Sequence, residues 1–228
     1  MARRARVGIC TYCGSEREVT EDHIIPQCLW TGRVPKKVPK VPACRQCNHI
    51  LKSVLDAYLR DLLITDRHAA MSPIAQELHA KYIRSVLTNK SRMDRDYRER
   101  GTVIAKVSPS GLFAGYGLIS RAVNERTEQI LTMMVRGLHQ YYLDVSLPPD
   151  TSFTIIRLFE KEHFEEVSQM IDLLDGGYEM IGNGNVFSCA YASASRIGFP
   201  HIGFWELVFY RRVAFAVMTH LPIARLPE

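Results

Sequence analysis

Long apolar runs are missing from this sequence of 228 residues. No stretch approaches the roughly 20 apolar residues that a membrane-spanning helix requires. The start of the chain, MARRARVGIC, is basic, but no apolar segment of the kind found in secretion signals follows it. The sequence therefore predicts no membrane association and a cytoplasmic location, where thiols remain reduced.

Internal repeats and low-complexity segments are also missing, which argues against a repeat protein. The composition, 46% hydrophobic and 23% charged, excludes global disorder. The length allows one large domain or two small ones.

Acidic residues are scarce in the first quarter of the chain. Residues 1–60 contain 11 Lys and Arg but 5 Asp and Glu, so the whole net charge of +5 originates there. A basic segment of this kind favours a polyanion such as nucleic acid. A surface that only keeps the protein soluble would have the same composition, so charge alone does not decide between the two.

Cysteine is uncommon, but four of the six cysteines form two short pairs, Cys10-x2-Cys13 and Cys44-x2-Cys47. One CxxC pair could be a redox site, whereas two pairs in a reducing compartment indicate a tetrahedral zinc site of four thiolates. Such a closed site is structural, and the simplest interpretation of this region is a zinc ribbon. The other two cysteines are interpreted as small buried apolar residues: Cys28 and Cys189.

The pattern of elements predicts an α+β fold in three parts. Residues 1–64 would form the zinc module, residues 65–149 a helical region, and residues 150–228 a small α+β unit with an antiparallel sheet. The expected helices cover about residues 48–63, a segment from Pro73 into the charged run 91–100, residues 124–144 and residues 160–175. The expected strands lie within residues 152–159, 176–182, 185–193 and 202–220.

One stretch of the C-terminal part has two interpretations. WELVFYRRV, residues 205–213, combines aromatic residues with two arginines. It could be a nucleic-acid surface, but an antiparallel hairpin with a solvated turn explains the same residues.

The motif EDHIIP, residues 21–26, lies between the cysteine pairs, and Asn48 follows the second pair directly. Hydrolysis of a phosphodiester needs a base for water, and a neutral imidazole such as His23 serves near pH 7. It also needs a divalent cation, and Asp22 and Asn48 offer the oxygen ligands that Mg²⁺ takes. The alternative is structural, with Asp22 and Asn48 as helix caps and His23 hydrogen-bonded in a turn.

These motifs, CxxCG at 10–14, EDHIIP at 21–26 and CxxCN at 44–48, together resemble the HNH (His-Asn-His) endonuclease family. The resemblance covers about residues 8–62 and implies the treble-clef ββα-metal fold, with Zn²⁺ held by the four cysteines. It further implies that His23 is the general base and that Asp22 and Asn48 hold a catalytic Mg²⁺ or Mn²⁺. The expected products carry 5′-phosphate and 3′-hydroxyl ends.

The sequence departs from the family pattern at two positions. Many members have histidine where Asn48 stands, although the asparagine form also occurs. The basic residue usually follows three positions later, whereas Lys52 follows by four. His49 is a further candidate for a ligand or a phosphate contact. The expected nucleic-acid contacts are basic residues of the loop and the following helix: Arg33, Lys36, Lys37, Lys40 and Lys52.

The resemblance predicts a metal-dependent endonuclease that hydrolyses DNA, with RNA not excluded. One alternative is a non-catalytic zinc-ribbon DNA-binding protein, which would not need Asp22, His23 and Asn48 together. Another is a defence effector nuclease gated by a ligand, and a role in restriction or phage defence would fit a free-standing nuclease. Residues 65–228 would then supply target choice, a homodimer interface or a site for a regulatory ligand.

Overall fold

The computed structural model describes residues 6–88, 101–107, 111–120, 124–158, 177–181 and 184–220. Helices and antiparallel sheets are mixed in it, which confirms the α+β prediction. Within these ranges no helix combines the length and apolarity needed to cross a membrane. The helix expected over 160–175 and the charged run 91–100 lie outside the described residues.

The N-terminal module is a three-stranded antiparallel sheet followed by a helix. Its strands, in spatial order, are β1 (Arg6–Ile9), β2 (Glu16–His23) and β3 (Lys40–Cys44). A wide π-helical segment, Gln46–Lys52, follows β3 and leads without a break into α1 (Ser53–Ile64). The helix predicted for about residues 48–63 is therefore present, but its first turns are wider than those of an α-helix.

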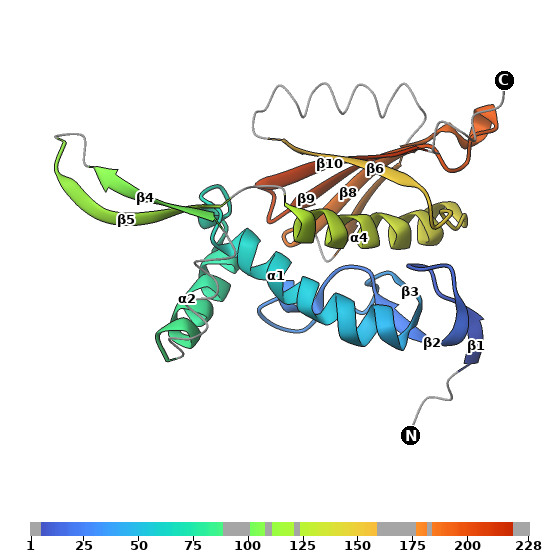
Figure 1. The fold of residues 1–228 in the computed structure, drawn as a ribbon, viewed down its shortest axis with the longest axis horizontal. Coiled ribbons are helices and arrows are strands. Elements are labelled where there is room, and N and C mark those ends of the chain that lie inside the picture. Colours follow the sequence, from blue (N-terminus) through green and yellow to red (C-terminus); the bar gives the residue numbers. More distant parts are fainter. Residues whose placement is uncertain are drawn as a thin grey trace.

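The middle of the chain is not all helical. The helices α2 (Pro73–Thr88) and α4 (Glu125–Leu143) are present as predicted. Between them, β4 (Gly101–Val107) and β5 (Phe113–Ser120) form an antiparallel hairpin that the sequence analysis missed. The β-branched residues of GTVIAKV favour a strand, and this signal was overlooked beside the charged run. The hairpin projects away from the rest of the molecule (Figure 1).

The C-terminal part contains the predicted antiparallel sheet, in the order β6-β10-β9-β8-β7. Its strands are β6 (Ser152–Leu158), β7 (Gly177–Ile181), β8 (Phe187–Ser193), β9 (Gly203–Phe209) and β10 (Val213–His220). The stretch WELVFYRRV forms the hairpin between β9 and β10. Trp205 and Phe209 are buried in its core, and the hydroxyl of Tyr210 donates to the carbonyl of Leu29 at 3.1 Å. The aromatic residues of this stretch therefore support the fold, as the hairpin interpretation predicts.

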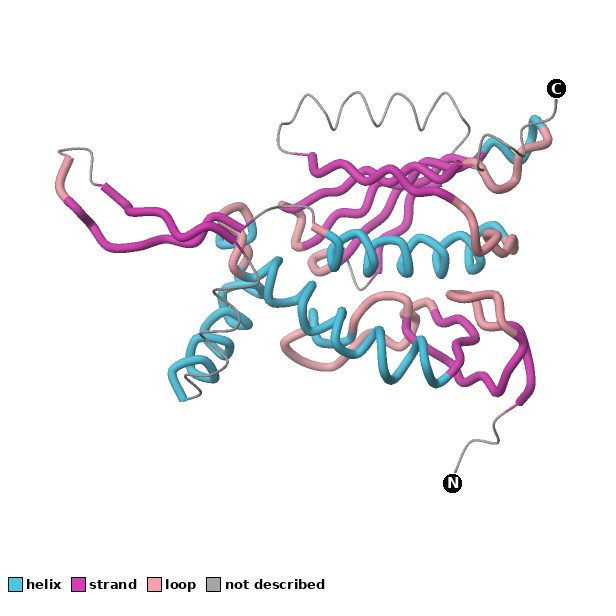
Figure 2. The backbone as a smooth tube through the Cα atoms, viewed as in Figure 1, coloured by secondary structure: helices cyan, strands magenta, loops and turns pink. Residues whose placement is uncertain are grey.

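Helix α4 lies between the five-stranded sheet and the N-terminal module (Figures 1 and 2). One continuous hydrophobic core contains residues of all three layers, including Ile24, Met134 and Trp205. At Gly137 of α4, an added Cβ would lie 2.9 Å from Cγ1 of Ile24, so the helix backbone itself contacts the EDHIIP motif. The two isoleucines of the motif are fully buried, and they fix this turn in the core.

The division into three domains stays a prediction.

Candidate active site

The four paired cysteines form one cluster in the N-terminal module. Cys10 and Cys13 belong to the turn between β1 and β2, where Gly14 adopts a φ of +70° that favours glycine. Cys44 ends β3, and Cys47 lies in the helical segment after it. Pairing of β2 with β3 places Val19 opposite Cys44 and so brings the two turns together.

The cluster has the dimensions of a zinc site. All four sulfur atoms lie within 4.8 Å of one another, and the Sγ atoms of Cys13 and Cys44 are 4.0 Å apart. Tetrahedral thiolates bound at the usual Zn–S distance would be separated by about 3.8 Å. The four cysteines could therefore hold a zinc ion with little rearrangement.

Asp22, near the end of β2, is buried and held from two directions. The hydroxyl of Tyr12 donates to its Oδ2 atom at 2.5 Å, and Nζ of Lys52 lies 3.7 Å from the same oxygen. Oδ1 has no hydrogen-bond partner among the residues that the structure describes. This arrangement leaves one carboxylate oxygen of Asp22 able to take a cation.

Lys52 is 1% exposed, which is rare for an ammonium group and requires compensating charges. Its Nζ atom donates to both carboxylate oxygens of Asp56 at 3.0 Å. Burial raises the pKa of Asp56 to about 6, although Lys52 opposes this rise. Lys52 therefore faces two carboxylates and not solvent. The sequence led us to expect that Lys52 contacts nucleic acid, but its ammonium group is buried and does not reach the surface.

Asn48 lies beside β2 on the face that carries Asp22. Its side-chain Nδ2 donates to Oγ1 of Thr20 at 3.4 Å, and positions 20 and 22 of a strand face the same side. Because the amide uses its nitrogen for this contact, its carbonyl oxygen is left for another ligand. Neither this oxygen nor Oδ1 of Asp22 has a hydrogen-bond partner in the described part of the chain, and oxygen ligands of this kind fit Mg²⁺ or Mn²⁺.

The π-helical segment explains why Lys52 follows Asn48 by four positions. In this helix the hydrogen bonds run from i to i+5, so a turn contains more residues than in an α-helix. Both side chains therefore reach β2, Asn48 at Thr20 and Lys52 at Asp22.

His23 is the last residue of β2 and is half-buried. The side-chain amide of Gln27 lies 3.1 Å from its ring nitrogens. Burial, together with the positive charge of Lys40, lowers the pKa of His23 below its usual value. The imidazole is therefore neutral at pH 7, the form that can accept a proton.

The remaining candidates for nucleic-acid contacts lie at the surface of the loop and helix start. Arg33, Lys36 and Lys37 are exposed, and Lys40 is half-buried with its Nζ 3.5 Å from a carboxylate oxygen of Glu21. His49 is also exposed, on the helix next to Asn48.

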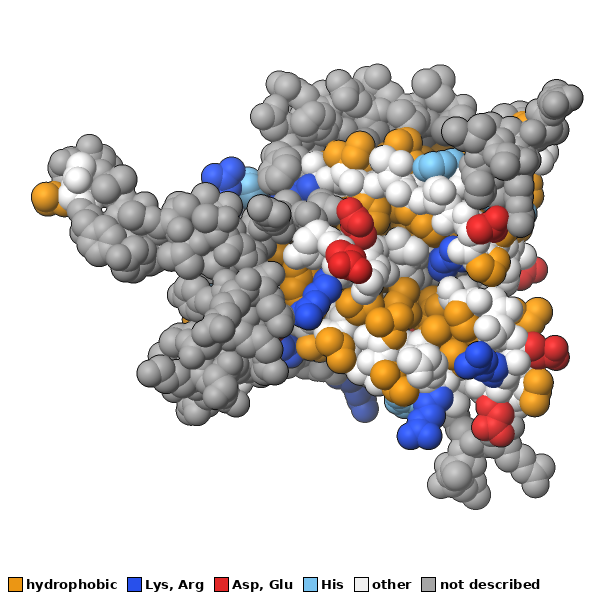
Figure 3. All heavy atoms as spheres, viewed as in Figure 1, with side chains coloured by type: hydrophobic (Ala, Val, Ile, Leu, Met, Phe, Trp, Pro, Cys, Tyr) orange, Lys and Arg blue, Asp and Glu red, His pale blue; other side chains and the backbone are white. Residues whose placement is uncertain are grey.

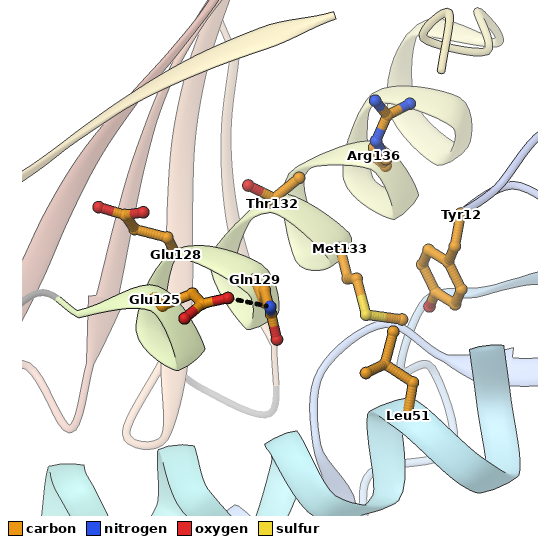
Figure 4. A pocket seen from close by; sticks show the side chains of 8 residues that line it. All are labelled: Tyr12, Leu51, Glu125, Glu128, Gln129, Thr132, Met133 and Arg136. Atoms are coloured by element: carbon orange, nitrogen blue, oxygen red, sulfur yellow. Dashed lines mark hydrogen bonds between the residues drawn. The ribbon is translucent and has the colours of Figure 1, made fainter. Parts of the chain in front are cut away.

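A shallow groove of about 350 Å³ lies at the surface between the N-terminal module and α4 (Figure 4). It is lined by Tyr12, Leu51, Glu125, Glu128, Gln129, Thr132, Met133 and Arg136. Hydrophobic side chains gather on this face of the molecule (Figure 3). Arg136 donates to the carbonyl oxygens of Leu147, Pro148 and Pro149, so its role is to hold the loop after α4.

Sequence reasoning missed two residues of the site, Tyr12 and Asp56. Tyr12 had a signal, because it stands inside the first CxxC pair and must lie near the metal cluster. Asp56 follows Lys52 by one helical turn, a spacing that indicates an ion pair.

Neither the curated proteins nor the solved structures contain a significant match to this chain. A family model does match, over the segment that contains both cysteine pairs, EDHIIP and Asn48. Residues 10–64 match the HNH endonuclease family, which confirms the resemblance that the three motifs indicate for this part of the chain.

Proposed function

We propose that this protein is a metal-dependent endonuclease that hydrolyses phosphodiester bonds in DNA. The observation that supports this proposal best is a pair of side-chain oxygens, one from Asp22 and one from Asn48, that have no hydrogen-bond partner among the described residues, with His23 next to Asp22 at the end of β2. A zinc ribbon that only binds DNA has no use for this set of groups. The match of residues 10–64 to the HNH endonuclease family also favours nuclease activity.

In the proposed reaction His23 removes a proton from the water that attacks phosphorus. Asp22 and Asn48 would bind Mg²⁺ or Mn²⁺, which when present neutralises charge on the phosphate and on the leaving oxygen. The 3′-oxygen leaves as its bond to phosphorus breaks and takes a proton from solvent water, which gives 5′-phosphate and 3′-hydroxyl ends. The cluster of four cysteines would bind Zn²⁺ and act only in folding, since a four-thiolate site has no open position.

A plasmid-nicking assay tests the proposal directly. The purified, zinc-loaded protein should convert supercoiled plasmid to the nicked form with Mg²⁺ or Mn²⁺ and fail to do so when neither ion is added. Asp22→Asn, which keeps the shape of the side chain and removes its charge, should lose this activity. If the zinc-loaded protein binds the plasmid without nicking it in either metal, the protein is a binding module and not a nuclease.

The exposed lysines of the loop should contribute phosphate contacts without sequence preference. The double variant Lys36→Gln/Lys37→Gln is expected to reduce the slope of log K against log salt concentration by about 2, because each lost contact removes about one unit. Fluorescence anisotropy with a labelled duplex, in a buffer without added Mg²⁺ or Mn²⁺, measures this slope without cleavage. Lys81→Gln is the matched control, since Lys81 is exposed but pairs with Glu77 on α2. An unchanged slope in the double variant would place the DNA on another surface.

A further inference from the structure

Tyr12 connects the cysteine cluster with the carboxylate of the active site. It stands between Cys10 and Cys13 in the sequence, and its hydroxyl donates to Asp22 Oδ2 at 2.5 Å. We infer that Tyr12 and Lys52 are positioning residues, which hold Asp22 by Oδ2 so that Oδ1 faces the catalytic cation. This inference rests on the proposed function, because it assigns a purpose to residues around the same metal ligand.

The backbone of the first cysteine pair fixes Tyr12 firmly. The N–H of Gly14 donates to the carbonyl of Cys10 at 2.8 Å, and the N–H of Thr11 donates to the carbonyl of Pro42 at 3.0 Å. The turn is therefore attached to β3 next to Cys44. Zinc bound to the four sulfur atoms would lock this turn, and with it the direction of the Tyr12 side chain.

The ring of Tyr12 is also confined. It lines the groove together with Leu51 and Met133, whose side chains point toward it (Figure 4). Its hydroxyl donates to Oδ2 of Asp22 at 2.5 Å, so both the ring and its hydroxyl are held in place.

The position of Lys52 leaves negative charge on Asp22. Its ammonium is bound to both oxygens of Asp56 at 3.0 Å but lies 3.7 Å from Asp22. Two carboxylates thus share one buried cation, and the closer pair is the one with Asp56. Asp22 is held in place by Lys52 without being fully neutralised, which suits a ligand for a divalent ion.

Tyr12→Phe removes the hydroxyl and keeps the ring, so it tests the inference with little change in packing. We expect it to lower the affinity for Mn²⁺ by about 10-fold or more, the usual effect of removing a group that orients a metal ligand. Electron paramagnetic resonance of free Mn²⁺ in a titration of the zinc-loaded protein measures this affinity without DNA or cleavage. Zinc content should stay at the wild-type value.

Tyr210→Phe is the matched control, because Tyr210 is buried and its hydroxyl donates to Leu29, outside the active site. It should leave the affinity for Mn²⁺ unchanged, while both variants lower the thermal midpoint by similar amounts. Asp56→Asn should also weaken Mn²⁺ binding, since Lys52 would then pair with Asp22 alone and compete with the cation.

The outcomes separate this inference from the proposed function. Equal Mn²⁺ affinity in wild type and Asp22→Asn would overturn the metal site of the proposed function, and the inference with it. Loss of binding in Asp22→Asn with wild-type affinity in Tyr12→Phe would overturn the inference alone. A fall in affinity in Tyr12→Phe but not in Tyr210→Phe supports it.

Discussion

Replacing Cys44 with serine is expected to abolish zinc binding and unfold the N-terminal module. Cys10, Cys44 and Cys47 are buried members of the hydrophobic core, and the short β1, β2 and β3 cannot form a large core of their own. Binding of a structural zinc ion contributes about 10–16 kcal/mol, which is as much as the entire stability of an ordinary domain. Zinc content and thermal unfolding of the purified variant measure the effect.

Cys28→Ser provides the control for this experiment. Cys28 lies outside the cluster, and its thiol donates to the carbonyl of Asp56 at 3.4 Å, a contact that serine can keep. This variant should retain wild-type zinc content and a similar thermal midpoint. A Cys44→Ser protein that is folded and still binds zinc as the wild type does would show that the four cysteines are not the zinc site.

The His23→Ala variant is expected to cleave plasmid DNA about 10²–10⁴ times more slowly than the wild-type protein, the usual contribution of a general base. The imidazole stands at the end of β2 and contacts Gln27, so its removal should leave the core and the cysteine cluster intact. Initial nicking rates under single-turnover conditions with saturating Mg²⁺ measure the chemical step.

Two further measurements make this loss interpretable. Wild-type zinc content and duplex affinity in His23→Ala would show that chemistry, and not folding or binding, is affected. His68→Ala, which changes a histidine outside the site, should cleave at the wild-type rate. If His23→Ala retained full EDTA-sensitive activity, another group would be the base, and exposed His49 would be the next candidate.

Local signals predicted much of the fold and of the site. CxxC spacing, the apolar periodicity after Cys47 and the β-branched strands all report on neighbours within a few residues, and the structure follows them. The hairpin β4–β5 had a similar local signal, but the charged run beside it was interpreted as the end of a helix, so these two strands of the helical region were not predicted.

The buried polar network could not be predicted in the same way. Whether Lys52 faces solvent or Asp22 depends on the packing of a helix against a strand thirty positions earlier in the chain. The unusual width of the helix at Gln46–Lys52 has no clear sequence signal either, yet it determines which side chains reach β2. The expectation that Lys52 contacts nucleic acid came from its charge and its place in the motif, and neither reports that the side chain is buried.

The direct contact between Ile24 and the backbone of α4 limits how the chain can be divided. A fragment that ends at residue 64 contains every group of the proposed chemistry, but it would leave Ile24, Ile25 and Leu29 in water. The turn that follows His23 would lose its packing against α4, and the position of the imidazole would no longer be fixed. The N-terminal module is therefore a poor candidate for transplantation into another protein, because α4, which packs against it, shares its hydrophobic core.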